Sequence, residues 1–214
     1  MADVKIYGFP QSTYVRTARM ICEEKGVPYD LEPIEFGSEA HLAVHPFGKI
    51  PGFRHGDVTI YETTAIGVYV DEAFDGPALR PPGAAGLARM VQWLSATCDY
   101  GYPALIRDLV IPRFVLPSRG ETPDEDAIKA ALPKIEHFLS VADAALTDSD
   151  FLAGEALSLA DLMLVPCVFY LSMTPEGKAM MPKYKGVSAW LERMMTRPSF
   201  AATMPPAPEQ EAAE

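Results

Sequence analysis

A segment rich in proline and glycine divides this chain of 214 residues into two halves with different sequence patterns. Residues 76–83 read Gly-Pro-Ala-Leu-Arg-Pro-Pro-Gly, and such a run continues neither a helix nor a strand. We therefore predict two domains rather than one continuous architecture. Their expected bounds are 1–76 and 86–204, with a linker at 77–85 and a disordered tail rich in Pro, Ala and Glu at 205–214.

The first half alternates strand patterns with helix patterns. Val4 and Ile6 alternate with polar residues as in a half-buried strand, and apolar residues from Val15 to Cys22 recur at helical spacing before Gly26. The full order, βαβ followed by ββα, is typical of an α/β thioredoxin-like domain. The remaining elements are expected as a strand at 29–34, two strands joined by a tight turn at 53–60, and a helix at 62–74.

The second half carries helix signals throughout, and we expect an all-α helical bundle. Residues 122–125, Thr-Pro-Asp-Glu, predict a capping box with its N-cap at Thr122, and the apolar face of the following helix runs from Ile128 to Leu146. Pro133 inside this helix predicts a kink or a restart. Pro103 and Pro112 predict a bent helix earlier in the same domain.

A second capping box, Ser158 to Asp161, precedes the longest apolar run, residues 162–171. This run is far shorter than the roughly 20 residues that span a bilayer, so we interpret it as a buried core helix. The last helix is expected to end before Pro198. Its apolar face is formed by Val187, Trp190, Leu191 and Met194.

Charge and cysteine content limit the possible partners. Asp and Glu outnumber Lys and Arg by 29 to 18, a formal charge of −11, which disfavours binding to nucleic acid or to an anionic membrane. The first residues lack the basic and apolar regions of a secretory signal. Three widely spaced cysteines argue against a disulfide framework and against a metal site, so we expect a cytoplasmic protein with reduced thiols.

Three segments of the first half combine groups suited to holding a small peptide. Ser12 lies at a predicted helix N-terminus, where its hydroxyl and the helix dipole would stabilise a thiolate. The bond between Ile50 and Pro51 is of the type that adopts cis at modest cost, which would leave the Ile50 backbone free to pair with a peptide. Glu62 and Thr63 lie where a strand meets a helix, a position that binds anions.

Each segment also has a purely structural interpretation. Ser12 would then only cap its helix, Pro51 would be an ordinary trans proline, and Glu62 would belong to an acidic first turn. Thr13 is a rival hydroxyl beside Ser12.

The three segments in this order resemble the glutathione-binding half of the soluble, serine-type glutathione transferases. The resemblance implies that Ser12 stabilises the glutathione thiolate and that Pro51 is cis. It also implies that Ile50 pairs with the cysteinyl backbone, that Glu62 accepts the ammonium group and that Thr63 holds the γ-glutamyl carboxylate. Plant-like members carry serine where Thr63 stands, a mild departure that retains the hydroxyl.

Further positions match the family one by one. His41 and Lys49 correspond to residues that bind the glycine carboxylate of glutathione. Arg16 resembles an arginine near the catalytic serine, and it would either strengthen the positive field or pair with a carboxylate. His45 replaces the asparagine that usually precedes Pro-Phe-Gly, and we assign it no role.

The second substrate is expected to be a small hydrophobic electrophile. Family members are typically homodimers, and the resemblance makes Phe47 a candidate anchor that inserts into the helical domain of the neighbouring subunit. Aromatic residues at such spacings are more often ordinary core residues than ligand contacts. The candidate electrophile-site residues are Phe9, Pro10, Tyr14, Tyr100, Tyr102, Ile106 and Phe114.

We therefore predict a glutathione transferase that uses glutathione as cosubstrate and no metal. A glutathione-dependent isomerase, dehalogenase or peroxidase would use the same peptide site. A non-enzymatic, chaperone-like binding protein of the same fold is a further alternative. A thiol-disulfide reductase is disfavoured because residues 10–16 contain no cysteine.

Overall fold

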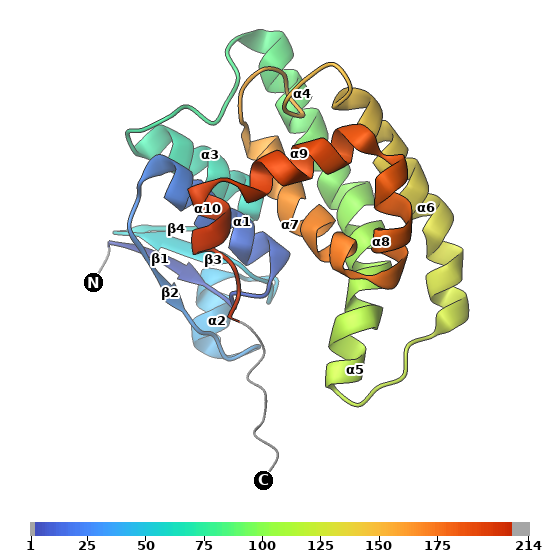
Figure 1. Ribbon diagram of the computed structural model, residues 1–214. Coiled ribbons are helices and arrows are strands. Elements are labelled where there is room, and N and C mark those ends of the chain that lie inside the picture. Colours follow the sequence, from blue (N-terminus) through green and yellow to red (C-terminus); the bar gives the residue numbers. More distant parts are fainter. Residues whose placement is uncertain (1–2, 207–214) are drawn as a thin grey trace. The chain divides into compact units, whose positions relative to one another are not determined.

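The computed structural model describes residues 3–206, which form two compact units (Figure 1). The first unit runs to Val70 and takes in the described residues from Pro198 onward, and the second unit is Asp71–Arg197. The first unit therefore ends at residue 70, where we expected 76, and it includes residues from 198 onward, where we expected the second domain to continue to 204. The expected disordered tail at 205–214 lies outside the described residues, apart from residues 205 and 206.

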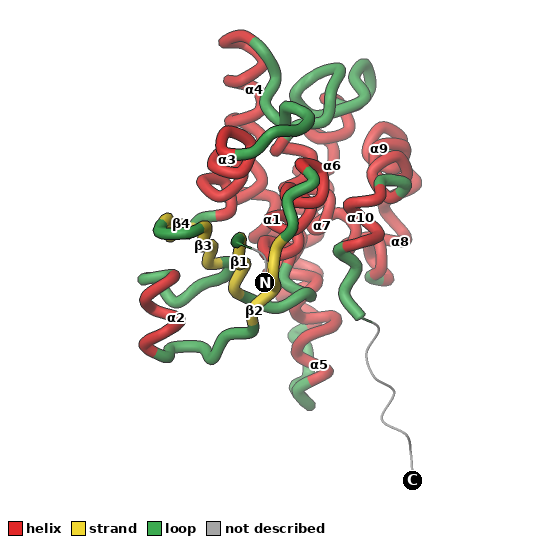
Figure 2. Tube along the Cα trace, turned by 90° about the vertical axis from the view of Figure 1, so that its left-hand side faces the viewer, coloured by secondary structure: helices red, strands yellow, loops and turns green. Residues whose placement is uncertain are grey.

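Four strands of the described chain form one mixed sheet in the first unit, in the order β2-β1-β3-β4 (Figure 2). Strand β1 pairs in parallel with β2 and antiparallel with β3, and β3 pairs antiparallel with β4. Ile6 lies opposite Phe53 across β1 and β3, and both side chains are fully buried. The elements are β1 (Val4–Tyr7), α1 (Thr13–Lys25), β2 (Tyr29–Glu32), α2 (Glu39–Val44), β3 (Gly52–His55), β4 (Val58–Tyr61) and α3 (Thr63–Ala73).

The helix α2 is absent from our sequence prediction. Its N-cap is Ser38, whose hydroxyl accepts a hydrogen bond from the His41 N–H at 3.1 Å. Six residues are too few to show a helical period, so the cap was the available local signal.

The chain returns to the first unit at α10 (Pro198–Ala202) because two arginines of α1 bind its carbonyl end. Arg16 is fully buried; its Nη2 donates to the Phe200 carbonyl at 3.2 Å, and its guanidinium lies 4.2 Å from the Phe200 ring centroid. Arg19 donates to the carbonyls of Ala202 and Thr203. These cations bind the negative end of the α10 dipole.

The second unit is helical, and α7 lies at its centre. Nearly every residue of α7 is buried, and α4, η1, η2, α8 and α9 contact it, which confirms the predicted core helix. Among the described residues, no helix is long and apolar enough to cross a membrane. The elements are α4 (Gly83–Ala96), η1 (Thr97–Gly101), η2 (Pro103–Val115), α5 (Leu116–Ser118), α6 (Glu125–Ala145), α7 (Leu159–Met173), α8 (Pro175–Met180), η3 (Met181–Lys183) and α9 (Lys185–Met195).

Three local predictions in this unit have different outcomes. The capping box at Ser158 and Asp161 is confirmed. The N-cap of α6 is Asp124 rather than Thr122, because the Asp124 carboxylate accepts from the Ala127 N–H at 3.0 Å and α6 begins at the next residue. The α6 helix continues through Pro133, so no restart occurs there.

The stretch around Pro103 and Pro112, where we expected a bent helix, consists of two π-helical segments, η1 and η2. Wider turns of this kind accommodate residues that do not fit the α-helical hydrogen-bond ladder. Gly101 in η1 faces the ring of Phe138 in α6, and an added Cβ would lie 2.7 Å from that ring. The absence of a side chain at Gly101 therefore allows the close approach of η1 and α6.

Candidate functional site

The sheet register brings the three candidate segments to one end of the sheet. Tyr7, the last residue of β1, lies opposite Gly52, and Gly52 lies opposite Tyr61 at the end of β4. The segment containing Ser12 follows Tyr7, Pro51 directly precedes Gly52, and Glu62 directly follows Tyr61. Residues separated by up to 50 positions thus share one edge of the first unit.

Ser12 is the N-cap of α1 and is half-buried. Its hydroxyl oxygen accepts a long hydrogen bond, 3.4 Å, from the Val15 N–H, so the hydroxyl proton is not used in this cap. Thr13 is only 5% exposed and is the less accessible of the two hydroxyls. Gly8 has φ +151°, and an added Cβ would lie 2.5 Å from Val15, so the turn that leads to Ser12 requires glycine.

The peptide bond between Ile50 and Pro51 is cis, as predicted. Pro51 is buried, Ile50 is half-buried and the Lys49 side chain is exposed. An added Cβ at Gly8 would lie 3.3 Å from the Ile50 side chain, which shows how closely this loop approaches the one before Ser12.

His41 is hydrogen-bonded to this loop. It is 2% exposed; its Nδ1 accepts from the Gly37 N–H at 3.1 Å, so its Nε2 carries the proton and donates to the Lys49 carbonyl at 2.9 Å. Both ring nitrogens are therefore engaged by backbone groups. In this arrangement His41 positions the loop that carries Lys49, a role that the sequence pattern did not indicate.

Glu62 and Thr63 form the N-terminal end of α3. Glu62 has a φ of +69°, and among the described residues other than glycine it is the one with a positive φ. Its carbonyl accepts a hydrogen bond from the Ile66 N–H at 2.9 Å. Its side chain is exposed, whereas Thr63 is buried. Left-handed backbone at a non-glycine residue is uncommon and concentrates at functional sites. The first N–H groups of α3 point out of the helix end, as in an anion site.

An aromatic group beside these segments was missed in the sequence analysis. Phe36 is 55% exposed and makes edge contacts with Phe9 and with His41, both at 5.2 Å between ring centroids. Phe36 follows β2 in a loop with no period or motif, so no sequence signal marked it. Pro10 and Tyr14, also expected at the electrophile site, are half-buried in the same unit.

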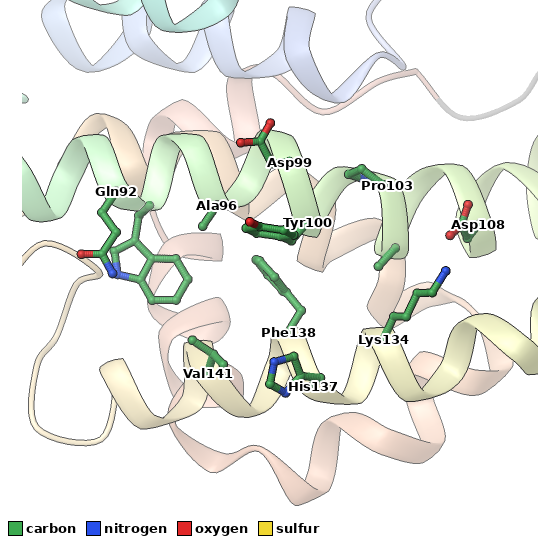
Figure 3. A pocket seen from close by; sticks show the side chains of 12 residues that line it. Gln92, Ala96, Asp99, Tyr100, Pro103, Asp108, Lys134, His137, Phe138 and Val141 are labelled. Carbon is green, nitrogen blue, oxygen red and sulfur yellow. The ribbon is translucent and has the colours of Figure 1, made fainter.

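The electrophile-site candidates of the second unit do not all share one cavity. Tyr100 is 70% exposed and lines a pocket of about 590 Å³ between α4, η1, η2 and α6, where its ring faces Phe138 (Figure 3). The lining of this pocket does not include Tyr102, Ile106 or Phe114. Tyr102 is half-buried, Ile106 is buried and Phe114 is exposed. Burial raises the pKa of the Tyr102 hydroxyl, and proximity to Cys167 raises it further.

Within residues 3–206, no group of three or more His, Cys, Asp or Glu side chains is placed to hold a metal ion.

Comparisons with known proteins identify the class to which this fold and site belong. Residues 6–78 match the glutathione S-transferase N-terminal domain, and residues 98–198 match the glutathione S-transferase C-terminal domain. Glutathione S-transferase F9 of Arabidopsis thaliana is 34% identical over 209 residues, covering 94% of this chain and 96% of the relative. Glutathione S-transferase 1 of Triticum aestivum is 31% identical over 212 residues, covering 93% and 92% of the two chains.

Solved structures agree with this classification. The apo form of glutathione S-transferase III superposes with a TM-score of 0.86 at 31% identity, covering 96% of this chain and 98% of that one. Glutathione S-transferase I from maize in complex with an atrazine glutathione conjugate gives 0.85 at 30% identity, covering 94% and 96%. The chain belongs to the glutathione S-transferase family. It is a glutathione transferase, and the predicted fold class, a thioredoxin-like domain followed by an all-α domain, is confirmed.

Proposed function

We propose that this enzyme conjugates the thiolate of glutathione to hydrophobic electrophiles and that Ser12 stabilises the thiolate. The observation that carries the proposal is the half-buried Ser12 hydroxyl at the N-terminus of α1, whose proton is not used in capping the helix. Lowering a thiol pKa from about 8.5 by two units requires roughly 2.7 kcal/mol in favour of the thiolate. One hydrogen bond to a charged group, about 1.5–3 kcal/mol, supplies this amount, and the helix dipole adds to it.

In the proposed complex, glutathione binds at the end of the sheet where the three segments meet. The Ile50 backbone pairs with the cysteinyl backbone, Glu62 accepts the ammonium group, and Thr63 with the first N–H groups of α3 holds the γ-glutamyl carboxylate. The exposed Lys49 ammonium binds the glycine carboxylate. His41 contributes by holding the Lys49 carbonyl, because its two ring nitrogens are already bonded.

The second substrate is proposed to be apolar and aromatic. Support comes from the exposed Phe36 and its contact with Phe9, close in sequence to Ser12, and from the half-buried Tyr14. The related maize enzyme was solved with a glutathione conjugate of atrazine. Aromatic faces of this kind bind planar rings by offset or edge contacts. Pro10 remains a candidate contact in the first unit, and Tyr100, Tyr102, Ile106 and Phe114 remain candidates in the second unit.

The thiolate proposal is tested with Ser12→Ala and the matched control Thr13→Ala. Glutathione binding is measured by calorimetry, the thiolate by its ultraviolet absorbance as a function of pH, and turnover with a chloronitroarene. We expect Ser12→Ala to bind glutathione, to raise the pKa of the bound thiol by about two units and to lower turnover roughly 25-fold at about pH 7, because the thiolate fraction falls by that factor when the pKa rises from about 6.5 to about 8.5. Thr13→Ala should retain the low thiol pKa. Equal thiol pKa values in wild type and Ser12→Ala would reject the role of Ser12.

The same protein samples separate the competing reactions. Turnover of halogenated alkanes, hydroperoxides and double-bond isomer substrates, each with glutathione, distinguishes conjugation from dehalogenase, peroxidase and isomerase activity. If turnover by conjugation is slower than turnover in each of the other three reactions, the proposed reaction is wrong, although the proposed peptide site is unaffected.

We also propose that the enzyme is a cytoplasmic homodimer anchored by Phe47. Phe47 is 70% exposed although it is aromatic, and the pocket between α4 and α6 is lined by Trp93, Phe138 and Val141. An apolar pocket of about 590 Å³ in a second copy accepts such a ring. Sedimentation tests this: Phe47→Ala should dissociate, whereas Phe36→Ala, a matched loss of an exposed ring, should remain dimeric. A fully dimeric Phe47→Ala would refute the anchor.

A further inference from the structure

His45 stands out because it is a buried histidine at the edge of the peptide site with no role in the mechanism above. It is the C-cap of α2 and is 2% exposed. Its Nδ1 is buried and makes no hydrogen bond to any of the described residues. A protonated imidazole would place an N–H at this position without a partner, so burial favours the neutral ring.

Aromatic side chains cover the His45 ring. Its centroid lies 5.1 Å from that of Tyr61 and 6.5 Å from that of Phe47, and the rings of Tyr61 and Phe47 are themselves 5.8 Å apart. Tyr61 is the last residue of β4 and is followed directly by Glu62. His45 is therefore packed against the residue that leads into the proposed ammonium acceptor.

Three titratable residues act on His45, from α2, from the loop before β3 and from the residue that precedes α3. Burial is the largest influence and lowers the pKa of His45. Glu62, just before α3, raises this pKa, His41 on α2 lowers it, the backbone of His45 itself raises it, and Lys49 on the loop before β3 lowers it. Tyr61 of β4 contacts the ring of His45 directly. Among these groups Glu62 is the carboxylate, so a proton on His45 would weaken the negative potential at Glu62.

We propose that His45 is a positioning residue of the glutathione site that must be neutral for Glu62 to bind the ammonium group of the peptide. This inference rests on the proposed role of Glu62. A proton on His45 and the ammonium of glutathione compete for the same carboxylate, so each weakens the binding of the other. Binding of glutathione therefore releases a proton from those protein molecules in which His45 is protonated. The affinity for glutathione then falls as the pH falls. The asparagine usual at this position has no proton to exchange.

The test uses S-methylglutathione, which has no ionisable thiol. Its dissociation constant is measured by calorimetry at about pH 7.0 and about pH 5.0, an interval in which histidine titrates and the terminal groups of the peptide keep their charges. Measurements in two buffers of different ionisation enthalpy give the number of protons released. The proteins are wild type, His45→Asn, Glu62→Gln and the control His55→Asn, whose side chain lies at the opposite end of β3.

We expect the dissociation constant of wild type to rise severalfold at the lower pH, with a limiting slope of about tenfold per pH unit and net proton release. His55→Asn should show the same ratio of dissociation constants. His45→Asn and Glu62→Gln should show a ratio close to one, whatever their absolute affinities. Equal ratios in wild type and His45→Asn would overturn the proposal.

A nuclear magnetic resonance titration of the His45 ring in wild type decides the question even if His45→Asn fails to fold. The proposal requires S-methylglutathione to lower the pKa of His45, and an unchanged or raised pKa refutes it. The two proposals also fail differently. Absence of S-methylglutathione binding at about pH 7.0 would reject the peptide site itself, whereas binding with a pH profile independent of His45 would reject this inference alone.

Discussion

Replacement of Asp161 by alanine should strongly destabilise the second unit, because this one side chain accepts four hydrogen bonds. Asp161 is fully buried. Its Oδ1 accepts from the Leu152 N–H at 2.9 Å and from Trp190 Nε1–H at 3.0 Å. Its Oδ2 accepts from the Ser158 N–H at 3.0 Å and the Ser158 hydroxyl at 2.8 Å. One carboxylate thus joins the turn before α7, the N-terminus of α7 and the helix α9.

The expected magnitude follows from the donors left behind. Asp161→Ala leaves three buried N–H groups without an acceptor, and each costs about 1–3 kcal/mol. Burial raises the pKa of Asp161, so removal of the carboxylate also relieves a desolvation cost. The net loss should be about 4 kcal/mol, within the range of about 3–5 kcal/mol for breaking a buried charged network.

Urea denaturation monitored by far-ultraviolet circular dichroism and by tryptophan fluorescence measures this loss. The control is Asp143→Ala, which removes one hydrogen bond, from the Val187 N–H at 3.0 Å, at a half-buried site and should cost about 1 kcal/mol. Asp161→Asn should fall between the two, because its amide keeps one acceptor oxygen but presents N–H groups to Ser158. A loss for Asp161→Ala no larger than that for Asp143→Ala would refute the reasoning.

Three further predictions follow from buried groups. Burial raises the pKa of Cys22 to about 12, so above about pH 8.5 the unfolded chain loses this thiol proton first. Stability should therefore fall with rising pH by at most about 1.4 kcal/mol per unit from this group, and urea titrations of Cys22→Ala should lack that contribution. Arg16→Met should lower stability by about 2 kcal/mol through loss of the charged hydrogen bond to the Phe200 carbonyl of α10, more than Arg19→Met at its half-buried position; an equal effect would contradict the reasoning. Gly177→Ala should cost at least about 2 kcal/mol in thermal denaturation, because the new Cβ would lie 1.9 Å from the Leu171 carbonyl oxygen; a neutral effect would show that α8 shifts freely.

Local sequence was a good guide where a structure depends on neighbouring residues. The capping box at Ser158 and Asp161 and the buried run 162–171 were read directly, because caps and helical periods act over a few positions. The same rule failed by two residues at α6, where Thr122 and Asp124 are both good caps and the carboxylate of Asp124 binds the helix N–H groups. The period could not reveal α2, which is too short.

The sequence by itself determined the two-part organisation, the helical faces and the residue types at the proposed peptide site: Ser12, Pro51, Glu62 and Thr63. These features are encoded locally by composition, periodicity and helix-end chemistry.

Only the tertiary structure decided how those residues come together. Strand register places Tyr7, Gly52 and Tyr61 in one row, and so sets three distant segments at one edge. Burial assigns both nitrogens of His41 to backbone groups and encloses His45 among aromatic rings. Such properties depend on contacts between residues far apart in the chain, and no window of sequence contains them.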